Sequence, residues 1–394
     1  MSDRFRDMLL LVLLAAVLIL FFSRILFTDK IIRAPDIIHE FYWWAKAVGG
    51  VRFADLMKIE LSAPWDALVN SGSTTEGGIT STAFLYQFKL IFHFIPAPEN
   101  VAWFIVFHLF VGAAGVYAFC RLIGTSRGAA FLAALIFALA PENASLINAG
   151  HVMKIATISF APWVFYFFEK GVQKQRLIYF LTTSMVLAFQ FFHTHWQIAF
   201  YTCLALAAYG VFRLFPIAWR SWFVDRREVA RLVNLQLVMV LFFLSTVAIS
   251  LVPLANWSRE SNRGVASGAN EGKGGLQVEE AMSWSLPPEE LVSFVIPGFF
   301  GFSRQEGGEN PPRIASYYWG RMAFTQTTDY MGLLPWLLVP LPLIFLRNRY
   351  TWLATGLLGG ALLFSMGKYT PFYWALYEYF PGINHFRVPK MMMF

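Results

Sequence analysis

Three titratable side chains, Asp36, His39 and Glu40, follow soon after the first apolar run of the sequence. A short helix that begins at Pro35 would place them at positions i, i+3 and i+4, on one face. A carboxylate held beside a histidine at a membrane surface is suited to accept a proton from a hydroxyl group. The alternative is a juxtamembrane helix with ordinary solvated charges, and the spacing leaves both interpretations open.

A second group of polar residues occupies the turn of residues 141–154, between two apolar runs. Glu142, His151 and Lys154 stand there together with two asparagines. Lys154 lies at the start of a predicted helix, where backbone N–H groups also favour anions. The turn therefore predicts a phosphate-binding site, and the alternative is a polar hairpin that meets water.

Two histidines, His193 and His195, mark another turn, and His108 lies alone within an apolar run. A structural or catalytic zinc site needs more ligands than this pair supplies. We therefore expect His195 to make polar contacts to a substrate, and we expect no bound metal. His108 is either a satisfied buried group or a residue that lines a cavity, and the sequence does not separate these possibilities.

The last polar groups precede the end of the chain. Tyr318, Arg321 and Asp329 are of types that stack on and hydrogen-bond a sugar, although an interfacial aromatic belt has the same composition. Arg387 and Lys390 fall in a short segment on the side where lysine and arginine are disfavoured. Binding of a lipid phosphate would explain this exception, and the alternative is that both side chains snorkel to lipid headgroups.

The amino-acid composition indicates that these residues belong to a membrane protein. The chain of 394 residues is 57% hydrophobic and 14% charged, whereas soluble domains carry about 25% charged residues. The net charge of +7 does not indicate a nucleic-acid binder, because the basic residues are spread between the apolar runs. Cys120 and Cys203 both lie within such runs, which excludes a disulfide framework and a cysteine metal cluster.

Apolar runs predict an all-α polytopic membrane protein with about nine transmembrane helices. The run Met8–Phe27 is too long for a signal peptide and is interpreted as a retained first helix. The stretch Thr80–Ile95 carries polar interruptions and predicts an interfacial helix. The predicted spans are Met8–Phe27, Val101–Ile123, Gly128–Ala140, Ile155–Glu169, Leu177–His193, Trp196–Phe215, Leu232–Pro253, Met331–Leu346 and Tyr350–Met366.

Lysine and arginine in alternate turns predict a cytoplasmic N-terminus. We expect a single transmembrane domain over residues 1–394, with long extracytoplasmic segments 28–100 and 254–330. All seven histidines then fall on the outer side or in the outer half of a span. A structural bundle has no reason to gather titratable groups on one face, whereas an enzyme with its site at that interface does.

Several segments, in this order, carry a resemblance to a known family. They are the acidic segment at Asp36, the Pro–Trp and Gly segment of residues 62–73, the turn Gly150-His-Val-Met-Lys, Tyr318-Trp-Gly, Asp329-Tyr-Met-Gly, Gly367-Lys-Tyr-Thr-Pro and Phe386-Arg-Val-Pro-Lys. The ordered set resembles the YfhO-type bacterial membrane proteins, a branch of the GT-C-fold glycosyltransferases. Asp66 departs from the neutral amide expected there, and the stretch after Gly72 lacks the usual proline. The family also begins another span where this chain ends, so we expect a C-terminally truncated GT-C-like bundle.

The resemblance implies an inverting enzyme that transfers a sugar from a polyprenyl-phosphate carrier to a glycan, lipid or protein acceptor on the outer face of a bacterial inner membrane. It implies Asp36 as general base and phosphate binding by Lys154 or Arg387. Beside these we expect Glu142 and His151 to complete the catalytic group and Lys390 to assist with the phosphate. The expected substrate contacts are His39, Glu40, His195, Tyr318, Arg321 and Asp329.

The expected partners are this lipid-linked donor, the acceptor and membrane lipids, with no nucleic acid and no cofactor. The sequence gives no support for a divalent metal. Two alternatives remain open: a transporter or flippase of lipid-linked saccharide, and a non-catalytic envelope assembly protein. The enzyme hypothesis requires Asp36, His151, Lys154 and Arg387 to share one pocket at the outer lipid boundary.

Overall fold

The computed structural model describes residues 2–34, 36–38, 65–66, 73–74, 94–95, 98–193, 195–259, 275–301, 318–322 and 329–393. This part of the chain is predominantly helical, apart from a short antiparallel pair of strands, β1 (Trp65–Asp66) and β2 (Ser73–Thr74), in which Trp65 lies opposite Thr74. It divides into two compact units, Met1–Val252 and Pro253–Phe394. The single domain expected from the sequence stays a prediction.

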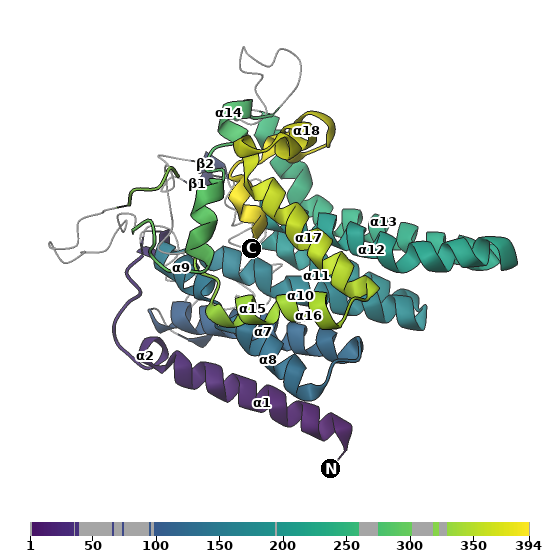
Figure 1. Ribbon diagram of the computed structural model, residues 1–394, viewed down its shortest axis with the longest axis horizontal. Coiled ribbons are helices and arrows are strands. Elements are labelled where there is room, and N and C mark those ends of the chain that lie inside the picture. Colours follow the sequence, from purple (N-terminus) through teal and green to yellow (C-terminus); the bar gives the residue numbers. More distant parts are fainter. Residues whose placement is uncertain are drawn as a thin grey trace. The chain divides into compact units, whose positions relative to one another are not determined.

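The first unit is a bundle of helices (Figure 1). Ser2 and Ser126 cap the N-termini of α1 and α8, because each side-chain oxygen accepts a backbone N–H of the first turn. The elements are α1 (Asp3–Phe21), α2 (Ser23–Leu26), α7 (Glu99–Leu122), α8 (Arg127–Ala138), α9 (Pro141–Ala149), α10 (Val152–Lys174), α11 (Leu177–Phe192), α12 (Trp196–Val224) and α13 (Arg226–Arg259), the last of which continues into the second unit.

Helices α7 and α10 form the centre of this bundle. Helix α10 packs against α7, α11 and α12, and α7 also packs against α8 and α1. A Cβ atom at Gly112 would lie 2.3 Å from the ring of Phe137 on α8, and one at Gly115 would lie 2.8 Å from the ring of Trp163 on α10. Small residues thus let large aromatic side chains lie against the backbone of α7, as in many helix contacts within membranes.

Polar contacts between helices show their relative directions. Gln173 at the end of α10 donates to the carbonyl of Leu122 at the end of α7, so these two helices run in the same direction. Gln190 near the end of α11 donates to the carbonyl of Thr157 near the start of α10, so α11 runs the opposite way. Arg213 in the second half of α12 donates to Glu169 near the end of α10, so α12 runs parallel to α10. The turns after α7, α10 and α12 therefore lie at one end of the unit, and the turns before α10 and α12 lie at the other.

Among the described residues, four helical segments are long and apolar enough to cross a membrane: Glu99–Leu122, Arg127–Ala149, Trp196–Val224 and Arg226–Val252. Four of the predicted spans fall on these segments. Helices α10 and α11 cover two further predicted spans, and α1 covers most of another, without meeting the same criteria. The prediction of about nine spans and of two long extracytoplasmic segments stays a prediction, and Thr80–Ile95 falls almost entirely outside the described residues.

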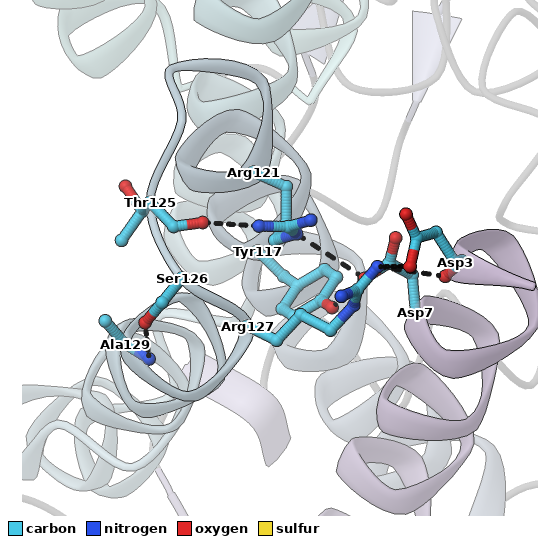
Figure 2. A network of polar contacts seen from close by, with 8 residues as sticks. All are labelled: Asp3, Asp7, Tyr117, Arg121, Thr125, Ser126, Arg127 and Ala129. Atoms are coloured by element: carbon cyan, nitrogen blue, oxygen red, sulfur yellow. Dashed lines mark hydrogen bonds and ion pairs between the residues drawn. The ribbon is translucent and has the colours of Figure 1, made fainter.

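The start of α1 is attached to the turn between α7 and α8 by a polar network (Figure 2). Tyr117 on α7 donates its hydroxyl to Asp7 at 2.7 Å, and Arg127 donates to the same carboxylate oxygen at 2.8 Å. Arg121 lies 3.4 Å from Asp7 and donates to the carbonyl of Thr125. The network places the N-terminal residues at the same end of the unit as the basic turn after α7, which the charge pattern predicts.

Replacing Tyr117 with phenylalanine is expected to lower the free energy of unfolding by about 1.5 kcal/mol, because a buried hydroxyl that donates to a carboxylate is lost. Thermal unfolding of the protein in detergent measures this change. Asp3→Asn is the control, since the side chain of Asp3 is 79% exposed and an exposed ion pair contributes little. Equal losses in the two variants would contradict the importance assigned to the Tyr117 contact.

The second unit consists of shorter elements. The span predicted over Met331–Leu346 is divided into α15 and α16 at Val339, because Pro340 has no N–H to continue the helical hydrogen bonds. Tyr377 donates to the carbonyl of Leu276. The elements are α14 (Val278–Ala281), η3 (Pro288–Phe294), α15 (Leu333–Leu338), α16 (Pro340–Phe345), α17 (Arg349–Ser365), η4 (Gly367–Tyr369), α18 (Pro371–Tyr379), η5 (Ile383–His385) and η6 (Pro389–Met393).

Candidate functional site

The turn between α9 and α10 lies directly against the segment that carries Asp36. Gly150 ends α9 with φ of +88°, a left-handed conformation that favours glycine. A Cβ atom at Gly150 would lie 2.9 Å from the Cβ of Asp36 and 2.9 Å from the backbone nitrogen of Ile37. Glycine is therefore required at this position for two reasons: the left-handed backbone conformation and the close approach of the Asp36 segment.

Asp36 belongs to a helical turn in which Ile38 donates its N–H to the carbonyl of Ala34. The side chains of Ala34 and Ile37 are buried, whereas the Asp36 side chain remains 47% exposed. Burial of the apolar neighbours thus holds the turn in place and leaves the carboxylate accessible. His39 and Glu40, predicted to share its face, lie outside the described residues.

His151 connects Asp36 with Lys154. The Nε2 atom of His151 lies 3.5 Å from Oδ2 of Asp36, and its Nδ1 atom lies 3.2 Å from Nζ of Lys154. An ammonium group only donates hydrogen bonds, so Nδ1 must accept, and the proton of the neutral ring is then on Nε2. The ring therefore presents an N–H to the carboxylate of Asp36. Residues far apart in the sequence form one cluster of carboxylate, imidazole and ammonium.

Lys154 occupies an unfavourable place for a cation. Lys154 is buried, with 6% of its surface exposed, and it lies in the first turn of α10. The N-terminal end of a helix carries a partial positive charge, which favours anions and disfavours a second cation. The charge of Lys154 and the N–H groups at the start of α10 act in the same direction, so the local electrostatics favours an anion.

The electrostatics around Lys154 includes a second histidine, His195, which begins the turn into α12. Burial, together with the charge of Lys154, lowers the pKa of His151 to about 3. Burial, Lys154 and His151 lower the pKa of His195 to about 3. Both rings are therefore neutral at pH 7, and Lys154 supplies the positive charge of the cluster.

Lowering the pH from 7 toward 4 is expected to destabilise the first unit. The folded pKa of His151 and of His195 lies below the ordinary value of 6.5, so the unfolded chain binds more protons between about pH 6.5 and 3. This contribution to stability is present above pH 6.5 and is lost as the pH falls through that range. The midpoint of thermal unfolding, measured against pH in detergent, should vary less in His151→Gln than in the wild type.

His385→Gln is the control for this prediction. It removes an exposed histidine of the second unit, and it should leave the pH dependence of the midpoint unchanged. Parallel curves for His151→Gln and the wild type would show that protonation of this partly buried ring does not couple to unfolding.

Two further histidines of the first unit are buried inside it. His108 on α7 and His193 after α11 lie with ring centroids 5.8 Å apart. The Nδ1 atom of His108 contacts the carbonyl of Phe104 at 2.7 Å, so His108 has a satisfied contact within its own helix. The four described histidines of this unit thus gather at the end opposite the basic turns. Which end faces the outside of a cell stays a prediction.

Glu142 does not belong to the same turn as this cluster. It lies in the first turn of α9, eight residues before Gly150, which is about 12 Å along a helix axis. Its side chain is half-buried. The catalytic role of Glu142 stays a prediction.

Two of the predicted sugar contacts, Tyr318 and Arg321, belong to a network in the second unit. The Tyr318 hydroxyl and the backbone N–H of Arg321 donate to one carboxylate oxygen of buried Glu290, at 2.6 and 2.8 Å. The Arg321 guanidinium pairs with Glu289, and this lowers the pKa of Glu289. The sequence does not single out Glu289 and Glu290, because two adjacent glutamates do not indicate which residues they contact.

The remaining predicted residues also find partners within the second unit. Lys390 forms an ion pair with Asp329, and both side chains are nearly buried. A phosphate contact by Lys390, or a sugar contact by Asp329, would require this pair to open. The Arg387 guanidinium lies 5.2 Å from the ring centroid of Trp284, a cation–π contact. The structure thus brings Asp36, His151 and Lys154 together, while Arg387 is described only within its own unit.

A bound metal ion requires several histidine, cysteine, aspartate or glutamate side chains close together. Within the described residues, no three of these side chains form a group that could hold a metal ion. Comparisons of the chain with models of protein families, with curated proteins and with solved structures give no match.

Proposed function

We propose that this chain is a membrane glycosyltransferase of the GT-C type, related to the YfhO-type proteins, that uses a polyprenyl-phosphate-linked sugar. One observation carries the proposal. An accessible carboxylate, Asp36, lies beside His151 and Lys154, which come from a different segment of the chain. A proton acceptor next to a site that favours an anion is the minimum that this reaction requires.

In the proposed reaction, the oxygen of an acceptor hydroxyl attacks the anomeric carbon of the sugar. The bond between that carbon and the phosphate oxygen breaks, and the polyprenyl phosphate leaves with both electrons of the bond. Asp36 accepts the proton of the hydroxyl, which makes the oxygen a stronger nucleophile. Attack from the face opposite the phosphate inverts the configuration at the anomeric carbon.

Lys154 stabilises the negative charge that grows on the leaving phosphate. Its burial strengthens this interaction, because the effective dielectric constant is lower than in water. The N–H groups at the start of α10 add to the same field. His151 donates from Nε2 toward Asp36 and accepts from Lys154, so it fixes the distance between the proton acceptor and the cation.

The proposal also places the reaction at a membrane. Four described segments are suited to cross a bilayer, and the histidine cluster lies at the end of the first unit opposite its basic turns. By the preference of basic turns for the cytoplasm, the cluster is assigned to the outer face of a bacterial inner membrane. Acceptor and sugar are those of a cell-envelope glycan, lipid or protein.

The test uses the purified full chain in liposomes supplied with polyprenyl-phosphate sugars that carry a radiolabel in the sugar. Transfer of the label to membrane or envelope acceptors is the expected result. Passage of a fluorescent lipid-linked saccharide across the liposome membrane, without any transfer, would instead identify a flippase and overturn the proposal. Absence of both activities with a panel of common sugars would favour an assembly protein.

A further inference from the structure

The turn that joins α12 and α13 carries exposed aromatic and basic side chains together. The exposed fractions of the aromatic residues lie between 51% and 73%. The neighbouring arginines are exposed as well. We call this surface the hairpin tip, and it consists of Phe215, Trp219, Arg220, Trp222, Phe223, Arg226 and Arg227.

The hairpin tip extends past the neighbouring helix end (Figure 1). Gln175, just after the last residue of α10, contacts Glu228, and Arg231 donates to the carbonyl of Gln175. The residues between Ser221 and Glu228 therefore lie beyond the α10–α11 turn. Helix α12 has 29 residues and α13 has 34, which corresponds to about 43 and 51 Å at 1.5 Å per residue. Both exceed a hydrocarbon core of roughly 30 Å.

Aromatic side chains follow one side of α12 toward the tip. The rings of Phe215 and Trp219 stack at 5.9 Å, and those of Trp219 and Phe223 meet edge to face at 5.6 Å. These rings are amphipathic or apolar and remain uncovered within the described chain. Tryptophan is enriched where membrane meets water, because its ring suits the headgroup level.

Positive charge surrounds these rings. Residues 219–231 contain four arginines and two carboxylates, which leaves an excess of two positive charges. Both carboxylates are engaged locally: Glu228 accepts from Ser221 and Gln175, and Asp225 accepts the backbone N–H of Arg227. In the described part of the chain, no carboxylate forms an ion pair with the guanidinium groups of Arg220, Arg226 or Arg227.

We propose that the hairpin tip binds the headgroup of an anionic phospholipid. Arg226 and Arg227 hold the lipid phosphate, while Trp219 and Trp222 lie at the headgroup level beside the acyl chains. The Arg226 guanidinium already rests 5.3 Å from the ring centroid of Trp222, which orders the cation next to its aromatic neighbour. Guanidinium forks match phosphate oxygens, and arginines near a membrane surface attract anionic lipids.

The test measures lipid selectivity of the full chain. The protein is placed in nanodiscs of equimolar phosphatidylcholine and phosphatidylglycerol, and native mass spectrometry counts the lipids that remain bound after mild extraction. Wild-type protein is expected to retain phosphatidylglycerol in preference. The double substitution Arg226→Gln and Arg227→Gln is expected to reduce this preference roughly ten- to thirtyfold, since each arginine contributes about 1 kcal/mol.

The matched control, Arg4→Gln with Arg6→Gln, removes the same charge from exposed positions at the start of α1. It should leave most of the preference intact, and a Trp222→Leu variant should reduce it even though no charge changes. An unchanged preference in the Arg226 and Arg227 variant, or an equal loss in the control, would overturn the proposal. The measurement involves no sugar transfer, so its outcome is independent of the proposed enzyme activity.

Discussion

Replacing Asp36 with asparagine is expected to reduce the rate of sugar transfer by roughly 10²- to 10⁴-fold, the usual contribution of a positioned general base. The amide keeps the shape of the side chain and cannot accept the proton of the acceptor hydroxyl. The turn around Asp36 should remain folded, because Ala34 and Ile37 hold it by burial. Initial rates in liposomes with a radiolabelled polyprenyl-phosphate sugar measure the effect.

The matched control is Asp29→Asn, which makes the same chemical change at an exposed residue of the same connecting segment. It should retain nearly normal transfer. A normal rate in the Asp36→Asn variant would remove Asp36 from the role of base. Equal losses in both variants would point to the charge of the segment as a whole.

The position of Asp36, as distinct from its charge, can be changed through Gly150. A Gly150→Ala substitution introduces a Cβ atom 2.9 Å from the Cβ of Asp36 at a residue with φ of +88°, so the Asp36 segment must shift. Displacement of a catalytic group by about 1 Å can cost about 10²-fold in rate. Gly128→Ala is the control, because a Cβ atom there meets nothing within 4 Å.

Replacing Arg213 with methionine is expected to lower the free energy of unfolding by about 3–5 kcal/mol, the cost of breaking a buried ion pair. Arg213 on α12 donates twice to Glu169 on α10, and both hydrogen bonds are 2.7 Å long. The Glu169 side chain is 1% exposed and that of Arg213 is 13% exposed. The substitution would leave the carboxylate buried with its main partner removed. Thermal unfolding in detergent measures the loss.

Two companion variants separate charge from packing at this pair. Tyr209→Phe removes one hydrogen bond to Glu169 and should cost about 1 kcal/mol. Replacing both Glu169 and Arg213 with leucine should be far less harmful than Arg213→Met, because no uncompensated charge remains. If the double variant is as unstable as the single one, shape and not charge determines the stability here.

Much of the architecture could be predicted from periodicity and charge. Apolar runs predict the helices, since a backbone in lipid must satisfy its own hydrogen bonds. The alternation of basic turns predicts that residues near Arg121 and the N-terminus share one end, and the network around Asp7 confirms that these residues meet. Within the described residues, four segments are long and apolar enough to span a membrane. Charges such as Glu169 and Lys170 lower the hydropathy of α10, and α11 has only 16 residues.

Part of the candidate site was predictable for the same reason. Asp36 follows the first predicted span, and the turn with His151 and Lys154 precedes another. The charge pattern predicts the same side of the membrane for both segments. Their actual contact depends on Gly150, whose left-handed backbone and missing side chain let two segments touch. No pattern of residue types in the sequence predicts this contact.

What the sequence by itself determined is therefore the helical, membrane-type character of the chain and the polar segments that lie between its apolar runs. Only the tertiary structure decided the partners: Arg213 with Glu169, Lys390 with Asp329, and His151 between Asp36 and Lys154. The physical reason is the distance along the chain over which each feature acts. Periodicity reflects the surroundings of one helix, whereas a buried charge is balanced by a residue on another helix whose distance along the chain carries no signal.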